Sequence, residues 1–158
     1  MAEAAARQEL TARPTRTVRS ERFGTHAVPE DCVLTLPEGL VGIPHAREFW
    51  LADASGGPSP FRYLLSIDVP DLGFLVCDPT QVWPDYVCDL PRPGTGSEVL
   101  VLVLVTVRDQ PRELTANLLA PLVIDVETRV GQQVVLDALR YSTRHPLTTP
   151  APGVAARP

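Results

Sequence analysis

The chain has 158 residues, 44% of them hydrophobic, and a formal net charge of −5 at pH 7. This length and composition fit one folded domain with a hydrophobic core and argue against a disordered protein. The charge is uneven, since residues 23–146 carry eight arginines against sixteen acidic residues, a net charge of −8. Direct nucleic-acid binding is therefore disfavoured, because phosphates require a basic surface.

The two ends of the chain differ in composition from its middle. Residues 1–16 are rich in Ala, Arg and Thr, and residues 148–158 in Pro and Ala. Both are predicted to be disordered extensions of a domain at 17–147. No segment resembles a secretory signal, and the apolar run 99–105 is far shorter than the roughly 20 residues that span a membrane. We expect a cytoplasmic protein that does not enter the membrane.

The first half of the domain is predicted to contain short strands separated by turns. Partly alternating apolar residues indicate strands at 32–37, 48–53, 61–67 and 72–78. The sequence "SGGPSP" forms a flexible connection between the second and third of these, and "DVPD" forms the turn before the fourth.

The second half continues this pattern with a longer apolar strand. The run "EVLVLVLVTVR" at 98–108 indicates a strand buried on both faces. Residues 115–125 are predicted to be extended, with Pro121 at a bulge or edge, and 131–137 to form the last strand. Short helical turns are expected at 82–86 and 139–142. The prediction is a single all-β domain, either a compact antiparallel β-barrel-like fold or a sandwich.

The histidines and cysteines do not have the spacing of a metal or disulfide site. They are widely separated along the chain: Cys32, Cys77, Cys88, His26, His45 and His145. Without a close ligand pair we expect no metal, cofactor or disulfide framework. A nucleophile formed by Cys77 or Cys88 with His145 is an alternative. Because Cys77 continues an apolar run, burial is the commoner outcome, and we predict that the protein is not an enzyme.

Aromatic and acidic residues are concentrated in "DPTQVWPDYVCD" at 78–89. Proline fixes the backbone around Trp83 and Tyr86, and rigid aromatic residues of this kind are typical of binding hot spots. The alternative is that Trp83 closes one end of the core. The later segment "LRYSTRHPL" at 139–147 leaves the same two possibilities open: Tyr141 and Arg144 either pack as a C-terminal turn or add to a contact surface.

Several stretches occur in the order found in one known family. They are "LPEGLVGIPHAREFWL", "PDLGFLVCDP", "WPDY", "NLLAPLVI" and "YSTRHPL", and with their neighbours they cover nearly all of 17–147. In these stretches the chain closely resembles the flagellar assembly factor FliW family. The resemblance implies a non-enzymatic β domain, monomeric when free, that binds flagellin. It also implies that the free protein binds and antagonises the translational regulator CsrA. The alternative is a flagellin chaperone that does not act on CsrA.

The resemblance also implies where partners bind. The matching "DP…PDY" stretch is expected to form part of the shared contact surface, with further candidates downstream: Pro79, Trp83, Asp85 and Tyr86, then Asn117, Tyr141 and Arg144. Many members carry an acidic insert where this chain has only "DLPRPGTGSE" at 89–98. An acidic body docked beside an RNA-binding surface is expected to repel the messenger.

Overall fold

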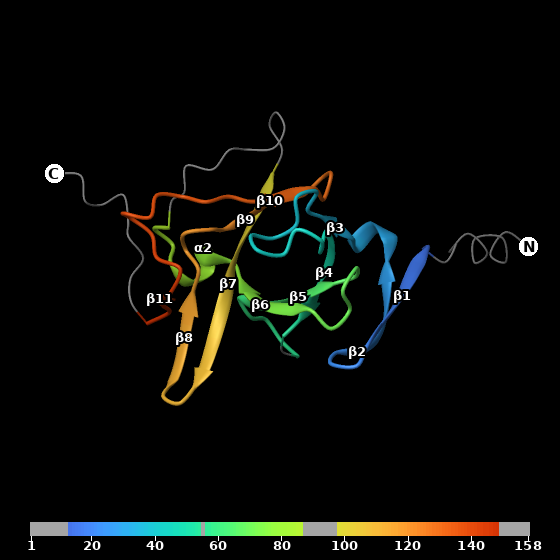
Figure 1. The fold of residues 1–158 in the computed structure, drawn as a ribbon, viewed down its shortest axis with the longest axis horizontal. Helices are drawn as coiled ribbons and strands as arrows, with labels where there is room; N and C mark the ends of the chain where they lie inside the picture. The colour runs from blue at the N-terminus through green and yellow to red at the C-terminus, as the bar shows by residue number, and fades with distance from the viewer. Residues whose placement is uncertain (1–12, 55, 87–97, 149–158) are drawn as a thin grey trace, which may run out of the picture.

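The structure, a computed structural model, describes residues 13–54, 56–86 and 98–148 (Figure 1). In these residues the regular secondary structure is almost entirely strand, with one short α-helix and one 3-10 turn. The strands form a hairpin of two and a sheet of nine. Most of the two predicted extensions, and Cys88 with nearly all of the 89–98 connection, lie outside the described residues.

The hairpin consists of β1 (Thr15–Ser20) and β2 (Gly24–Pro29), which pair antiparallel. Each strand has one buried residue, Val18 or Val28, and these pack with Val33 against Trp50 and Ile67. Val18 lies between threonine and arginine, and Val28 between alanine and proline, so the sequence pattern indicated no strands here. The 3-10 turn η1 (Glu30–Cys32) then leads into the larger sheet.

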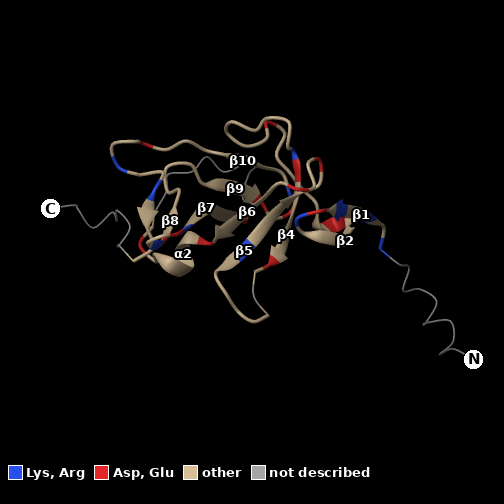
Figure 2. Ribbon diagram, turned by 60° about the horizontal axis from the view of Figure 1, so that its bottom comes forward, with Lys and Arg blue, Asp and Glu red and all other residues tan. Residues whose placement is uncertain are grey.

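Ion pairs and a turn carboxylate fasten this hairpin to the sheet. The Arg16 guanidinium donates to Glu30 at 2.6 and 3.0 Å and to Glu48 at 2.7 Å. Figure 2 shows basic and acidic residues side by side in this region. Asp71 accepts hydrogen bonds from the Ser20 hydroxyl at 2.7 Å and the Glu21 N–H at 2.8 Å. These contacts, with the small valine cluster, hold two strands that lie outside the main sheet.

The larger sheet begins as an antiparallel meander. It runs through β3 (Leu34–Thr35), β4 (Glu48–Asp53), β5 (Phe61–Ser66) and β6 (Gly73–Cys77), each paired with the next. All four strands lie within segments predicted from the sequence. Residues 30–32 form η1 rather than strand, so the first segment is shorter than predicted.

The long strand β7 (Val99–Asp109) bends the sheet because its two halves have different neighbours. Its first part pairs with β9 (Leu122–Asp125), which in turn pairs with β10 (Gly131–Gln133). Its second part pairs with β6 and with β8 (Arg112–Ala116), whose outer neighbour is β11 (His145–Pro146). The fold is sandwich-like, as one of the two predicted alternatives states, and the barrel is not closed (Figure 1).

Two predicted strands are corrected by this arrangement. The strand at 98–108 is buried only as far as Val105, and residues 106–109 are exposed because they project with β8 as a hairpin (Figure 1). The extended segment 115–125 is in fact the end of β8, a bend at 117–121 and β9. Pro121 is buried at this bend, and the predicted last strand ends at Gln133.

The larger sheet has two hydrophobic cores besides the small valine cluster of the hairpin. The first lies inside the bent sheet and includes Phe49, Leu64, Val76, Leu102 and Leu122. The second lies against β7 and β8, and its buried members are Cys77, Trp83, Tyr86, Val103, Val105, Ala116, Leu118 and Tyr141. Four of the sequence stretches singled out above meet in this second core: "PDLGFLVCDP", "WPDY", "NLLAPLVI" and "YSTRHPL". Within the described residues, no helix has the length and apolar character needed to span a membrane.

Candidate partner-binding site

The segment after β6 begins with the short helix α2 (Pro79–Val82). Asp78 caps it, because its carboxylate accepts from the Thr80 N–H at 2.9 Å and the Thr80 hydroxyl at 2.6 Å. Pro79 suits the first helical position, where no intrahelical N–H donor is needed. The helix ends at Val82 with Trp83 as its C-cap, and the Tyr86 N–H then bonds to the Trp83 carbonyl at 2.9 Å in a tight turn. The helical turn predicted at 82–86 therefore lies earlier, at 79–82.

The two aromatic residues of this segment face inward. Trp83 is 5% exposed and Tyr86 is 4% exposed. The Tyr86 hydroxyl donates a buried hydrogen bond to the Leu118 carbonyl at 3.0 Å. Burial of this degree favours the core interpretation of both side chains over direct contact with a partner.

The C-terminal segment packs against these two rings. Asp137 caps its turn: the carboxylate accepts from the Leu139 N–H and the carbonyl from the Tyr141 N–H, both at 2.9 Å. This turn, closed between Asp137 and Tyr141, overlaps the helical turn predicted at 139–142 but begins earlier. Tyr141 meets Tyr86 edge-on with ring centroids 5.7 Å apart, and His145 meets Trp83 edge-on at 5.4 Å. We call Trp83, Tyr86, Tyr141 and His145 the aromatic cluster.

The bend at 117–121 joins both segments to the sheet. The Asn117 side-chain oxygen accepts from the Ala120 N–H at 3.0 Å, which shapes the bend. The N–H groups of Leu118 and Leu119 both point at the Ser142 carbonyl, at 3.0 and 3.2 Å. Asn117 is half-buried, and in this structure its side chain serves the backbone.

The seven residues predicted from the sequence thus fall into three groups. Pro79, Trp83, Tyr86 and Tyr141 are buried, Asn117 is half-buried, and Asp85 and Arg144 are exposed. Asp85 and Arg144 lie within two residues of the contacting pair Trp83 and His145, so the fold brings their segments together.

One exposed residue of this surface was missed by the sequence analysis. Leu139 is 98% exposed on the Asp137-capped turn. Beside it the Arg140 guanidinium lies 5.3 Å from the centre of the Tyr141 ring. An apolar residue two positions after a capping aspartate was the only signal for it in the sequence.

Cys77 does not have the properties of a nucleophile. It is fully buried, and burial, with a smaller contribution from the Asp78 charge, raises the pKa of its thiol to about 12. The thiol is therefore protonated at neutral pH, whereas a nucleophilic cysteine must be a thiolate. The other proposed cysteine, Cys88, lies outside the described residues. In the part of the chain that the structure describes, no three His, Cys, Asp or Glu side chains gather as metal ligands would.

Comparison with known proteins gives a consistent result. The model of the family described as FliW protein matches residues 17–147. The flagellar assembly factor FliW of Natranaerobius thermophilus is 34% identical over 138 residues, which cover 82% of this chain and 91% of that protein. The flagellar assembly factor FliW of Heliobacterium modesticaldum is 35% identical over 137 residues, covering 82% and 89%. A crystal structure of the flagellar assembly factor FliW has a TM-score of 0.73 and 29% identity, covering 84% of this chain and 96% of that one.

Proposed function

Because this chain belongs to the FliW family of flagellar assembly factors, we propose that it is a cytoplasmic, non-enzymatic binding protein for flagellin and a CsrA-type regulator. Flagellin occupies the protein while export is slow. Export frees the protein to bind the regulator, which then loses its hold on the flagellin messenger. Flagellin synthesis is thereby coupled to secretion. Family membership over residues 17–147 is the observation that carries this proposal.

We assign the partner contact to the surface over the aromatic cluster. Asp85 and Arg144 are exposed there and Leu139 projects fully into solvent, while the buried rings fix the backbone beneath them. A rigid support reduces the entropy lost when a surface is ordered on binding. In this arrangement the buried aromatic residues act by positioning their exposed neighbours.

The acidic body supports the second half of the proposal. Residues 23–146 carry a net charge of −8. An RNA-binding regulator presents a basic surface to its messenger. A strongly acidic protein docked beside that surface is attracted to the regulator and repels the phosphate backbone.

Size-exclusion chromatography of the full chain with the regulator and flagellin of the same organism tests the proposal. We expect a complex with the regulator that flagellin competes away. If the protein forms a complex with flagellin but not with the regulator, it is a flagellin chaperone that does not act on the regulator. Binding to neither partner would overturn the proposal.

A charge-matched pair of double variants tests the assigned surface. Replacing both Asp85 and Arg144 by alanine is expected to weaken partner binding about tenfold or more, as truncation of central interface residues does. The control replaces Asp53 and Arg62, an exposed cross-strand pair on β4 and β5, and leaves the net charge the same. Equal affinities for the two double variants would place the contact elsewhere.

A further inference from the structure

The strands β3 and β10, which end the main path of the nine-stranded sheet, meet at a single point. Thr35 and Val130 form an isolated parallel bridge, and the Thr35 N–H donates to the Arg129 carbonyl at 2.9 Å. Beyond this point the strands separate, because Pro37 has no N–H to continue the pairing. Gly39, with φ of 69°, then turns the chain, and its N–H bonds back to Leu36 at 2.8 Å.

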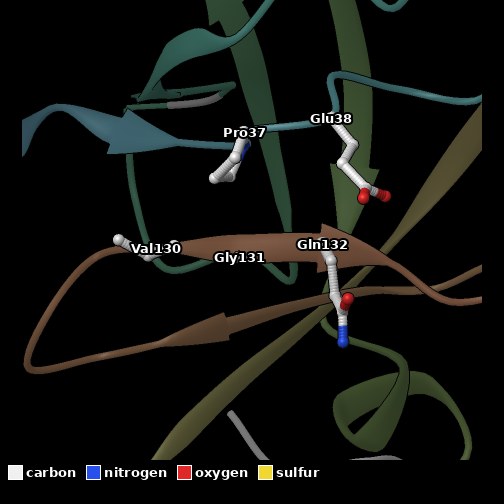
Figure 3. Close-up of a pocket in the computed structure, with 5 residues that line it drawn as sticks. All are labelled: Pro37, Glu38, Val130, Gly131 and Gln132. Carbon is white, nitrogen blue, oxygen red and sulfur yellow. The ribbon is translucent and has the colours of Figure 1, made fainter.

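The same two edges are joined again by one side chain. The Gln133 side-chain oxygen accepts from the Val41 N–H at 2.8 Å, and its amide nitrogen donates to the Ala120 carbonyl at 3.0 Å. Between the bridge and this contact lies a hollow of about 240 Å³ that opens to the surface. We call it the seam hollow, and its lining residues are Pro37, Glu38, Val130, Gly131 and Gln132 (Figure 3).

The β10 backbone turns polar groups toward this open edge. The Val130 carbonyl accepts from Asp125 at 3.0 Å and the Val134 N–H donates to Pro121 at 2.9 Å, so both residues pair toward β9. In an antiparallel pair the direction of pairing alternates along the strand. The Gly131 carbonyl and the Gln133 N–H therefore face away from β9. Groups of this kind on a strand edge are the usual template for an added strand.

The hollow also has a defined charge and an apolar rim. Glu38 is the one charged residue among its lining residues, and its side chain points toward β10 (Figure 3). It forms no salt bridge within the described part of the chain. Val41 and Val130 beside it are 67% and 40% exposed. An occupant that matches the hollow would combine branched apolar side chains with a basic one.

We propose that the seam hollow binds an extended segment of a partner protein, which adds to the edge of β10 and places a lysine or arginine beside Glu38. Backbone pairing would supply most of the affinity, and the basic residue would supply selectivity. A second copy of this chain fits poorly, because paired seam hollows would bring two Glu38 carboxylates together. The surface differs from the aromatic cluster, so the proposal stands apart from the assigned flagellin and CsrA contact.

The test uses the isotopically labelled full chain and the capped peptide Thr-Val-Arg-Val-Thr, followed by backbone amide NMR. We expect shifts centred on residues 130–133 and 39–41, with a dissociation constant of about 1 mM, as is usual for a short free peptide. Replacing the peptide's arginine by glutamate, or one of its two valines by proline, should abolish these shifts. Shifts that fall elsewhere, or equal binding of the glutamate peptide, would overturn the proposal.

Two charge variants complete the experiment. Glu38→Lys should weaken the binding of the peptide at least about tenfold, which corresponds to a change in binding free energy of about 1.4 kcal/mol. Asp109→Lys makes the same charge change at the far tip of the β7–β8 hairpin and should leave binding unaltered (Figure 1). If both variants weaken the peptide equally, net charge rather than the seam hollow is responsible. If the amides at 130–133 shift with protein concentration alone, a second copy is the occupant and the proposal fails.

Discussion

Tyr86, which the sequence predicts as a partner-binding residue, is a buried member of the second core. Its hydroxyl donates to the Leu118 carbonyl at 3.0 Å, and its ring meets Tyr141 edge-on. Tyr86→Phe keeps the ring and removes the hydroxyl, which leaves the buried carbonyl without this donor. We expect the free energy of unfolding to fall by about 1–2 kcal/mol in urea titrations.

Tyr63→Phe is the matched control for this variant. Tyr63 is 39% exposed on β5, so loss of its hydroxyl should change the free energy of unfolding by less than about 0.5 kcal/mol. If the two variants unfold at the same urea concentration as the unmodified protein, the Tyr86 hydroxyl does not stabilise the fold.

Among the residues that the structure describes, Arg129 is the non-glycine residue with a left-handed backbone, at φ of 57°. This conformation costs an ordinary residue roughly 1–2 kcal/mol, whereas asparagine tolerates it. Its carbonyl must nevertheless accept from Thr35 at 2.9 Å, and its N–H donates to Asp125 at 2.8 Å. Arg129→Asn should therefore raise the free energy of unfolding by about 0.5–1 kcal/mol.

Arg129→Val provides the opposing case. A branched side chain in the left-handed region is strongly disfavoured, so this variant should lose at least about 1 kcal/mol. Chemical unfolding of both variants measures the difference. Equal stability of the asparagine and valine variants would show that the backbone at this position relaxes without strain.

At the scale of elements, the β1–β2 hairpin depends on carboxylates whose pKa is lowered in the folded protein. The Arg16 hydrogen bonds hold the pKa of Glu30 below its usual value. The pKa of Asp71 is lowered mainly by the hydrogen bond from the Ser20 hydroxyl. The Arg22 and Glu21 N–H groups lower it further. A lowered folded pKa stabilises the hairpin above the unfolded pKa of about 4, and this stabilisation is lost as the pH falls through the folded values.

We therefore expect the hairpin to loosen in acid before the main sheet does. Amide hydrogen exchange should lose protection at Val18 and Val28 below about pH 4, while Val76 and Val103 stay protected. Asp71→Ala should produce part of this loss at neutral pH, because it removes the acceptor of the Ser20 and Glu21 hydrogen bonds. Uniform loss of protection across hairpin and sheet would show that they unfold together.

The same elements show what could be predicted from the sequence. The strands β4, β5 and β6 follow from local apolar patterns bounded by proline and glycine. The hairpin was missed because one buried valine per strand gives almost no periodic signal. The division of β7 between two sets of neighbours depends on pairings distant in sequence, which no local pattern encodes. The exposed end of β7 likewise depends on its pairing with β8 in the projecting hairpin.

The segments of the candidate site were singled out from the sequence, but the orientation of their side chains was not predicted. Proline and aspartate indicated an irregular segment at 78–86, and the structure packs it against the C-terminal turn. Trp83 and Asp85 lie two residues apart, yet the first is buried and the second exposed. Composition cannot distinguish an aromatic residue of an interface from one of a core, since both environments favour it. The three-dimensional packing of Trp83 in the second core, including its contact with His145, shows its burial.

At the scale of the whole molecule, the net charge of −8 over residues 23–146 creates a field that extends beyond any one contact. Such a field speeds association with a basic partner. Salt screens the field, with a Debye length of about 8 Å at physiological ionic strength. If the proposed antagonism of the CsrA-type regulator uses this field, repulsion of RNA and binding of the regulator are separable. Binding depends mainly on local contacts, whereas repulsion depends on acidic residues near the bound messenger.

Asp85→Asn tests this separation, because it neutralises an exposed acid on the assigned contact surface while keeping the side chain's size. We expect the variant to release flagellin messenger from the regulator less effectively, by about threefold or more, while its affinity for the regulator changes less. Gel-shift competition measures the first quantity and titration calorimetry the second. Asp53→Asn, on the exposed end of β4, makes the same charge change away from that surface and should alter neither. Equal losses of affinity and of RNA release for Asp85→Asn would mean that occlusion, rather than charge, displaces the messenger.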